Sequence, residues 1–215
     1  MKFPFLASVV IFLLVLHHNL NKSKKIGKKQ EDSFWKKEYD ANTTRKQPID
    51  DLVYITFSAD DYFPLKLLPS DQVSDFILAF PQIKEILPRL LELSNSKIVN
   101  LGSYSNTDLK FKYGIANFNM LSQYDENYIS LVSLLHRYGM CYYEAHYNEA
   151  ALKIMTYAIS IGSDVAETYH IASLLLFEAD DKAGLKELVQ KAASLPKHRK
   201  NVIFRKLKES GLSVD

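Results

Sequence analysis

Apolar residues are distributed along this chain in four blocks of different character. The first is FPFLASVVIFLLVLHHNL at residues 3–20, whose uninterrupted apolar part runs from Phe3 to Leu16. A signal-peptide core needs about 7 to 15 apolar residues and a membrane span about 17 to 25, so this length falls between the two. No small-residue cleavage pattern follows it. We therefore predict a retained hydrophobic anchor over residues 1–20, with a cleaved signal peptide as the alternative.

The second block, residues 21–47, is charged and shows no apolar periodicity. It opens with NKSKKIGKK, so a group of lysines follows the apolar stretch directly. These lysines fit a solvated linker and equally an attraction to anionic lipid headgroups. By the positive-inside rule they favour the cytoplasmic side for the rest of the chain. We predict a juxtamembrane linker, in which Trp35 lies at the membrane interface or folds back on the domain.

The third block, residues 48–124, mixes short helical patterns with polar segments. IDDLVYITFSADDYFP alternates β-branched and aromatic residues with others, which predicts one extended segment lying along helices. Ser70 and Asp71 can cap a first helix, and a second follows Pro81 with apolar residues at spacings of three and four. NLGSYSNTDLKFKYGIANFN, at residues 100–119, is rich in turn-forming residues. We expect it to form a long loop packed over the helices.

The fourth block, residues 125–215, has the sharpest helical periodicity. One helix is predicted from about Asn127 to His146 and the next from about Asn148 to Ile161. Small residues where the two helices cross imply an antiparallel pair. The periodic positions are Ile129, Val132, Leu135, Gly139 and Tyr142 on the first helix and Ala151, Leu152, Met155, Ala158 and Ile159 on the second.

This pair resembles one tetratricopeptide repeat, a helix-turn-helix unit of about 34 residues. Leu135 stands at the large apolar position, Gly139 at the close-contact glycine and Tyr142 at the tyrosine. Ala151, Met155 and Ala158 stand at the two alanines of the second helix and at the residue between them. A second unit follows about 33 residues later. It keeps Ala172, Leu188 and Pro196 but has Gly184 and Lys191 where alanines are usual.

The layout of the whole chain also resembles a family of uncharacterised clostridial membrane proteins. The segments that carry this resemblance are the N-terminal apolar stretch, IDDLVYITF, SNTDLKFKYGIANF and the C-terminal helices. The resemblance implies no activity and supplies no catalytic residues.

Together these patterns predict an all-α fold in which an anchor helix precedes a tetratricopeptide-like array of helical hairpins with a long packed loop. Because about three stacked repeats are normally needed, we expect the helices between Ser70 and Leu93 to complete one end. A helix from about Lys197 to Ser210, stopped by Gly211, is expected to cap the other end, although its basic pattern would also suit a membrane surface. Asp164 and Glu167 predict a capping box at the start of the second unit.

Charge and chemistry point away from several classes of function. The 27 basic and 25 acidic residues leave a net charge of +2, so we expect no nucleic-acid partner. Cys141 and His146 are separated by about 500° of helical rotation, which argues against a nucleophile and its base. The sequence has no phosphate-binding glycine loop, serine-hydrolase elbow or zinc-ligand motif. We expect a protein without catalytic activity, cofactor, metal or small-molecule substrate.

The tetratricopeptide resemblance implies that the first helix of each unit lines a groove for a protein or peptide partner. The residues at those positions are Ser133, His136, Met140, Tyr143, Glu144, Tyr169 and Ser173. These side chains could instead be solvated or stacked on the upstream helices. The expected function is a scaffold held at the membrane through residues 3–20. The alternative is an envelope enzyme or regulatory subunit whose site lies in residues 96–124 and uses Asn106, Asp108, Lys110 and Lys112.

Overall fold

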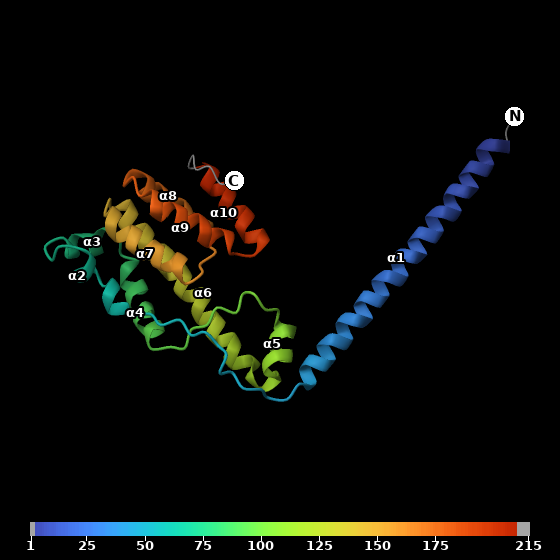
Figure 1. Ribbon diagram of the computed structural model, residues 1–215, viewed down its shortest axis with the longest axis horizontal. Helices are drawn as coiled ribbons and strands as arrows, with labels where there is room; N and C mark the ends of the chain where they lie inside the picture. The colour runs from blue at the N-terminus through green and yellow to red at the C-terminus, as the bar shows by residue number, and fades with distance from the viewer. Residues whose placement is uncertain (1–2, 210–215) are drawn as a thin grey trace. The chain divides into compact units, whose positions relative to one another are not determined.

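The computed structural model describes residues 3–209, which are mostly α-helical (Figure 1). No β-strand occurs within that range, so the all-α prediction is confirmed. The chain divides into two compact units. Unit 1 comprises Met1–Ile49 and Tyr104–Phe118, and unit 2 comprises Asp50–Ser103 and Asn119–Asp215.

Helix α1, Phe3–Thr43, is continuous through most of the segment that we expected to be a linker. The predicted juxtamembrane linker over residues 21–47 is therefore helical as far as Thr43. The physical reason is composition, since Lys, Glu and Gln are good helix formers and no proline interrupts the segment before Pro48. Within the described part of the chain, no helix is long and apolar enough to cross a membrane.

The predicted long loop is also largely helical. Helix α5, Asn106–Tyr113, starts at a capping box in which Asp108 N donates to Ser105 Oγ at 3.2 Å and Ser105 N donates to Asp108 Oδ2 at 3.3 Å. Helix α6, Ile115–Glu144, follows after one residue and so begins well before the predicted Asn127. The polar residues that indicated a loop thus serve as the N-terminal cap of a helix.

Unit 1 is built from α5 packed on the end of α1. Leu109 and Tyr113 of α5 are buried, as is Ala41 of α1. The buried amide of Asn117 donates to the carbonyls of Gln47 and Tyr113, at 2.8 and 2.7 Å. These bonds fix the chain that leaves α1 against the end of α5.

Unit 2 contains the helical hairpins that the periodicity predicts. It includes α6 from Asn119 onward. The helices that follow are α7 (Asn148–Ser160), α8 (Ala166–Glu178), α9 (Lys182–Ala193) and α10 (Lys197–Glu209) (Figure 1). This arrangement is a helical-repeat-like all-α fold, in which short turns connect successive helices.

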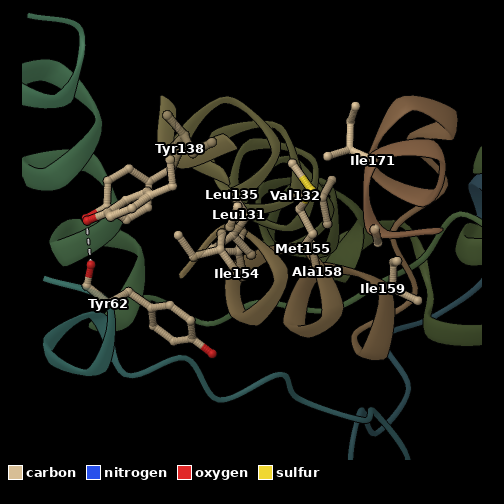
Figure 2. Close-up of a cluster of buried hydrophobic side chains, with 14 of the residues drawn as sticks. Tyr62, Leu131, Val132, Leu135, Tyr138, Ile154, Met155, Ala158, Ile159 and Ile171 are labelled. Atoms are coloured by element: carbon tan, nitrogen blue, oxygen red, sulfur yellow. Dashed lines mark hydrogen bonds between the residues drawn. The ribbon is translucent and has the colours of Figure 1, made fainter. Parts of the chain in front are cut away.

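Small residues bring α6 and α7 close together. A Cβ atom on Gly139 would lie 3.1 Å from Met155 Cγ, so only glycine allows this approach without displacing the methionine. Figure 2 shows Met155, Ala158 and Leu135 in the same buried cluster, and each is fully buried. The packing role assigned to these positions from the sequence is observed.

The segment upstream of α6 covers its other side. Tyr157 Oη of α7 donates to Thr56 O at 3.1 Å, so the extended segment lies along a helix, and residues 50–58 pair in no sheet. The short helix η1 (Ala59–Tyr62) follows, and Tyr138 Oη donates to Tyr62 O at 2.7 Å (Figure 2).

Three further helices complete this side: α2 (Pro64–Leu67), α3 (Val73–Ala79) and α4 (Ile83–Ser94). The Phe76 ring of α3 lies 4.5 Å from that of Tyr142. These helices therefore extend the stack, although α3 begins after Gln72 with no side-chain cap from Ser70 or Asp71.

Helix α10 packs on α8 and α9. Ile203 and Leu207 are 0% exposed, which agrees with the expected capping helix. The predicted capping box at α8 is wrong, because its N-cap is Val165 and no side chain caps it. The two carboxylates bind α10 instead: Arg199 donates to Asp164 at 3.0 Å and Lys206 to Glu167 at 3.1 Å. The expected end of this helix at Ser210 and Gly211 lies outside the described residues.

Candidate functional site

The predicted groove residues divide into an accessible set on α6 and a buried set on α8. Ser133 and Glu144 are exposed, whereas His136, Met140 and Tyr143 are half-buried. Tyr169 is 0% and Ser173 1% exposed, so neither offers a surface to a partner. Burial and nearby Asp164 raise the pKa of Tyr169 to about 12. For these two residues the predicted position on an accessible groove is wrong.

The physical reason is the register of α8. This helix is buried on most of its circumference because α7, α9 and α10 all pack against it. Between its two ends, α8 exposes His170 and Leu174, both half-buried, and Phe177, which is 69% exposed. They recur at spacings of four and three and so share one face of the helix. The spacing of Tyr169, Ala172 and Leu176 was the signal that Tyr169 faces the core.

Helices α6 and α8 run side by side in the same direction. His136 Nδ1 of α6 lies 3.0 Å from Thr168 Oγ1 in the first turn of α8, and Asn148 Nδ2 at the start of α7 donates to Glu178 Oε2 at the end of α8 at 3.4 Å. Because only three residues separate α6 from α7, the C-terminal ends of α6 and α8 lie near each other, as expected for parallel neighbours. Burial lowers the pKa of His136, and Glu167 opposes that shift. A neutral imidazole therefore joins the two helices at neutral pH.

We use the name α6–α8 surface for the accessible side chains that these two neighbouring helices carry in the stretches named above. Its apolar part consists of half-buried side chains that continue into the core, together with the exposed ring of Phe177. The surface is formed by Met140, Tyr143, Glu144, His170, Leu174 and Phe177. Such a mixture of aromatic, thioether and aliphatic groups with polar groups at the edge suits contact with another polypeptide.

The cysteine has the environment of a core residue. Cys141 is 2% exposed, and Gln82 Nε2 donates to its Sγ at 3.3 Å. Burial raises the pKa of the thiol, so the thiolate that a nucleophile needs is disfavoured. Among the described residues, no group of three or more His, Cys, Asp or Glu side chains could hold a metal ion.

The polar residues proposed for an alternative site in residues 96–124 hold α5 against α1. Asp108 accepts from Lys37 Nζ at 2.8 Å, and this bond with those from Ser105 lowers the pKa of its carboxyl to about 2. Lys110 donates to Glu38, which lowers the pKa of Glu38. Lys112 donates to Tyr104 Oη at 3.1 Å, and Asn106 is exposed at the start of α5. Asp108 and Lys112 line one open cavity of about 500 Å³, whereas Asn106 and Lys110 do not line it.

A cavity of about 430 Å³ lies between α7, α8 and α9. Its apolar lining comes from Leu152, Ile159, Leu176 and Leu188. Lysines and carboxylates of both signs, among them Glu149, Lys153 and Lys191, surround it. This balance of charge selects no particular ligand, and no sequence motif pointed to the cavity.

Comparisons of the chain with family models, with curated proteins and with solved structures found no match.

Proposed function

We propose that the chain is a membrane-anchored helical-repeat protein that binds a protein or peptide partner on the α6–α8 surface and has no catalytic activity of its own. The observation that carries the proposal is Phe177. It is a large aromatic side chain, 69% exposed, on a helix that is otherwise mostly buried. Aromatic anchors of this kind dominate the binding energy of protein interfaces.

The surroundings of Phe177 favour a polypeptide partner. Leu174 lies one turn earlier on the same helix, and Met140 lies on the parallel helix α6. Both are half-buried and pack against the core, so the apolar surface has a firm base. An apolar side chain of a partner could cover Phe177 while polar groups reach Glu144 or Glu178.

Membrane attachment is proposed for the N-terminal end of α1. Its described apolar side chains are exposed, with Phe12 and Leu14 each at 64%. Exposed apolar groups on neighbouring turns are unfavourable in water and need an apolar environment. By the positive-inside rule, the lysines that follow favour the cytoplasmic side for the rest of the chain.

We do not favour the alternative of an envelope enzyme or regulatory subunit with a site in residues 96–124. Its candidate groups Asp108 and Lys110 are paired with Lys37 and Glu38. A catalytic acid or base needs a pKa near the working pH, whereas the pKa of Asp108 is about 2.

The test is site-specific photo-crosslinking in the membranes of the source cells, using the full chain. A crosslinker replaces Phe177 in one variant and Leu78 of α3 in the matched control, because Leu78 is 73% exposed. The proposal expects a discrete crosslinked product at position 177 and none at position 78. Equal products at both positions, or no product at position 177, would overturn it.

A second measurement uses the partner recovered in that experiment. Phe177→Ser should weaken binding roughly thirtyfold, the effect of losing an aromatic hot spot, whereas Leu78→Ser should leave affinity unchanged. Circular dichroism checks that both variants remain folded. His136 is unsuitable as a probe because its bond to Thr168 also holds α6 against α8.

A further inference from the structure

The polarity of α1 changes along its axis. Every described side chain from Val9 to Leu16 is apolar and at least 40% exposed. Consecutive residues of a helix are rotated by about 100°, so these side chains point in all directions around the axis. A segment that is apolar all round is satisfied only by apolar surroundings on every side, which a groove on a protein surface does not provide. A lipid bilayer does provide them.

Beyond Leu20 the helix becomes polar and strongly basic. Five exposed lysines lie within eight positions, and no acidic residue precedes Glu31 in the sequence. At about 100° per residue the five occupy roughly half of the helix circumference. We call this half the lysine face: Lys22, Lys24, Lys25, Lys28 and Lys29. The other half of this segment has Ile26 as its only large apolar residue.

From this arrangement we infer that α1 enters an anionic phospholipid bilayer end-on and that the lysine face binds the phosphate groups of the lipids. The inference rests on the membrane attachment proposed above and adds to it the lipid class and the orientation. A helix lying flat on a membrane separates apolar and polar residues across its two sides. In α1 the apolar and polar residues are instead separated along the helix axis. The lysine segment therefore has no apolar side that could lie in the membrane.

Distances along the helix agree with end-on entry. The apolar part from Phe3 to Leu16 is about 21 Å long, enough to pass the midplane of a hydrocarbon layer about 30 Å thick. Lys22 then lies about 9 Å beyond Leu16, where the headgroup layer begins to give way to water. The flexible stem of a lysine lets the ammonium reach back to phosphate. Lys28 and Lys29 lie further out, within about two Debye lengths of the surface.

Lipid class is tested by co-sedimentation of the full chain with phosphatidylcholine vesicles, with or without phosphatidylglycerol. We expect the anionic lipid to strengthen binding roughly 100-fold, with salt removing most of the gain. Replacing all five lysines of the lysine face by Gln should abolish the gain, and replacing them by Arg should keep it. Equal binding to both vesicle types, or a gain that survives the Gln variant, would overturn the inference.

Helix α10 supplies the matched control, because it is also basic. Lys197→Gln, Arg205→Gln and Lys208→Gln remove three exposed charges from it. These changes should leave vesicle binding unaltered. If they remove the anionic-lipid gain while the lysine-face variant keeps it, the phosphate site lies on α10 and the inference is wrong.

Orientation is tested with Trp35, the only tryptophan of the chain. It is 61% exposed and lies about 28 Å beyond Leu16 along the helix. End-on entry leaves Trp35 in water, so its emission should not shift when vesicles are added. A helix lying flat would bring Trp35 into the interface and shift its emission to the blue. In a Trp35→Phe background, Leu13→Trp should shift to the blue and be quenched by brominated lipid.

One further variant separates this inference from the proposed function. Leu13→Asp together with Leu14→Asp places charges in the apolar part and should abolish binding to every vesicle. If the double Asp variant loses all vesicle binding while the lysine-face variant binds normally, the anchor stands and the lipid-phosphate inference fails. If the double Asp variant also binds normally, the anchor fails as well. The crosslinking experiment at Phe177 uses neither segment and is unaffected by both outcomes.

Discussion

Two glycines of unit 1 show how one substitution can have opposite effects at different positions. Gly114 ends α5 with a φ of +81°, and a Cβ atom there would lie 2.2 Å from the carbonyl oxygen of Arg45. Gly27 lies inside α1, and a Cβ atom there would meet nothing within 4 Å. The first position needs glycine for both its conformation and its space, and the second needs it for neither.

Gly114→Ala should therefore destabilise unit 1 by more than about 1 to 3 kcal/mol, the usual cost of a strained backbone, because the steric clash adds to it. Hydrogen exchange of the α5 amides measures this loss. Gly27→Ala is the matched control and should stabilise α1 by about 0.5 to 1 kcal/mol, measured as increased helicity. Unchanged α5 protection in Gly114→Ala would show that the close approach to Arg45 does not exist in solution.

The carboxyl of Asp108 makes unit 1 sensitive to acid. Its pKa falls from 3.8 to about 2, first because of the bond from Lys37 and then because of those from Ser105. A depressed pKa in the folded state contributes stability that is present above pH 3.8 and lost as the pH falls through about 2. Protection of the α5 amides should decline in that window.

Lys37→Gln should raise the pKa of Asp108 toward 3.8 without reaching it, because the bonds from Ser105 remain. A carboxyl-carbon NMR titration measures this shift. Lys36→Gln, one residue away on α1, removes the same charge without removing the bond and should change the pKa far less. Equal shifts in the two variants would mean that general charge, and no direct bond, controls Asp108.

At the scale of elements, α10 is held on α8 by two kinds of contact of unequal weight. Leu207 is 0% exposed, whereas the ion pair of Lys206 and Glu167 has side chains 37% and 39% exposed. Glu167 raises the pKa of Lys206, yet water and salt screen most of an exposed pair. Burial of apolar surface should therefore dominate the attachment of α10.

Leu207→Ala should lower the free energy of unfolding by about 2 to 5 kcal/mol, because it leaves a cavity under α10. Lys206→Gln should have a much smaller effect. Val202→Ala, at a position 43% exposed on the same helix, controls for the loss of apolar side-chain atoms. Urea unfolding measures all three. An effect of Lys206→Gln equal to that of Leu207→Ala would show that the ion pair contributes as much as the buried leucine and would contradict the prediction.

The same comparison of elements explains what the sequence could predict. Helices α7 and α9 carry apolar residues at helical spacing because one side of each is buried, so their positions were predictable. Helix α5 has eight residues, most of them polar, and depends on its cap and on α1 for stability. The pattern of apolar and polar residues within this segment shows neither the cap nor the contact with α1, so the segment resembled a loop. The charged part of α1 was missed because periodicity detects only helices that bury one face.

The candidate surface was predictable on α6 and not on α8. Positions such as Met140 and Glu144 followed from the resemblance to a repeat, since α6 has one buried and one open side. Helix α8 is enclosed by α7, α9 and α10, which leaves a narrow accessible stripe. A shift of one residue, about 100° of rotation, then exchanges buried Tyr169 for accessible His170. The spacing of Tyr169, Ala172 and Leu176 indicates a buried stripe, but His170, Leu174 and Phe177 have a similar spacing, so the packing of the neighbouring helices decides which stripe faces outward.

At the scale of the whole molecule, the two compact units differ in what holds each together. Unit 2 has a continuous apolar cluster that includes fully buried side chains from α4, α6, α7, α8 and α10. Among the residues of unit 1 whose burial is described, few are buried and apolar, with Leu109 and Tyr113 as the large ones, and the unit relies on the pairs Lys37–Asp108 and Lys110–Glu38. Exposed or partly exposed pairs contribute less than buried apolar surface.

Hydrogen exchange should therefore resolve two levels of stability in the intact chain. Amides of α5 are expected to exchange through a local opening of lower free energy, and amides of α7 and α8 only near the global free energy of unfolding. Leu135→Ala, which creates a cavity at a fully buried position of α6, should lower protection in α7 and α8 by about 2 to 5 kcal/mol and leave α5 unchanged. Gly114→Ala should lower the protection of the α5 amides and leave that of the α7 and α8 amides unchanged. If either variant lowered protection in both units equally, they would unfold as one cooperative body and the weaker contacts of unit 1 would not set a separate opening.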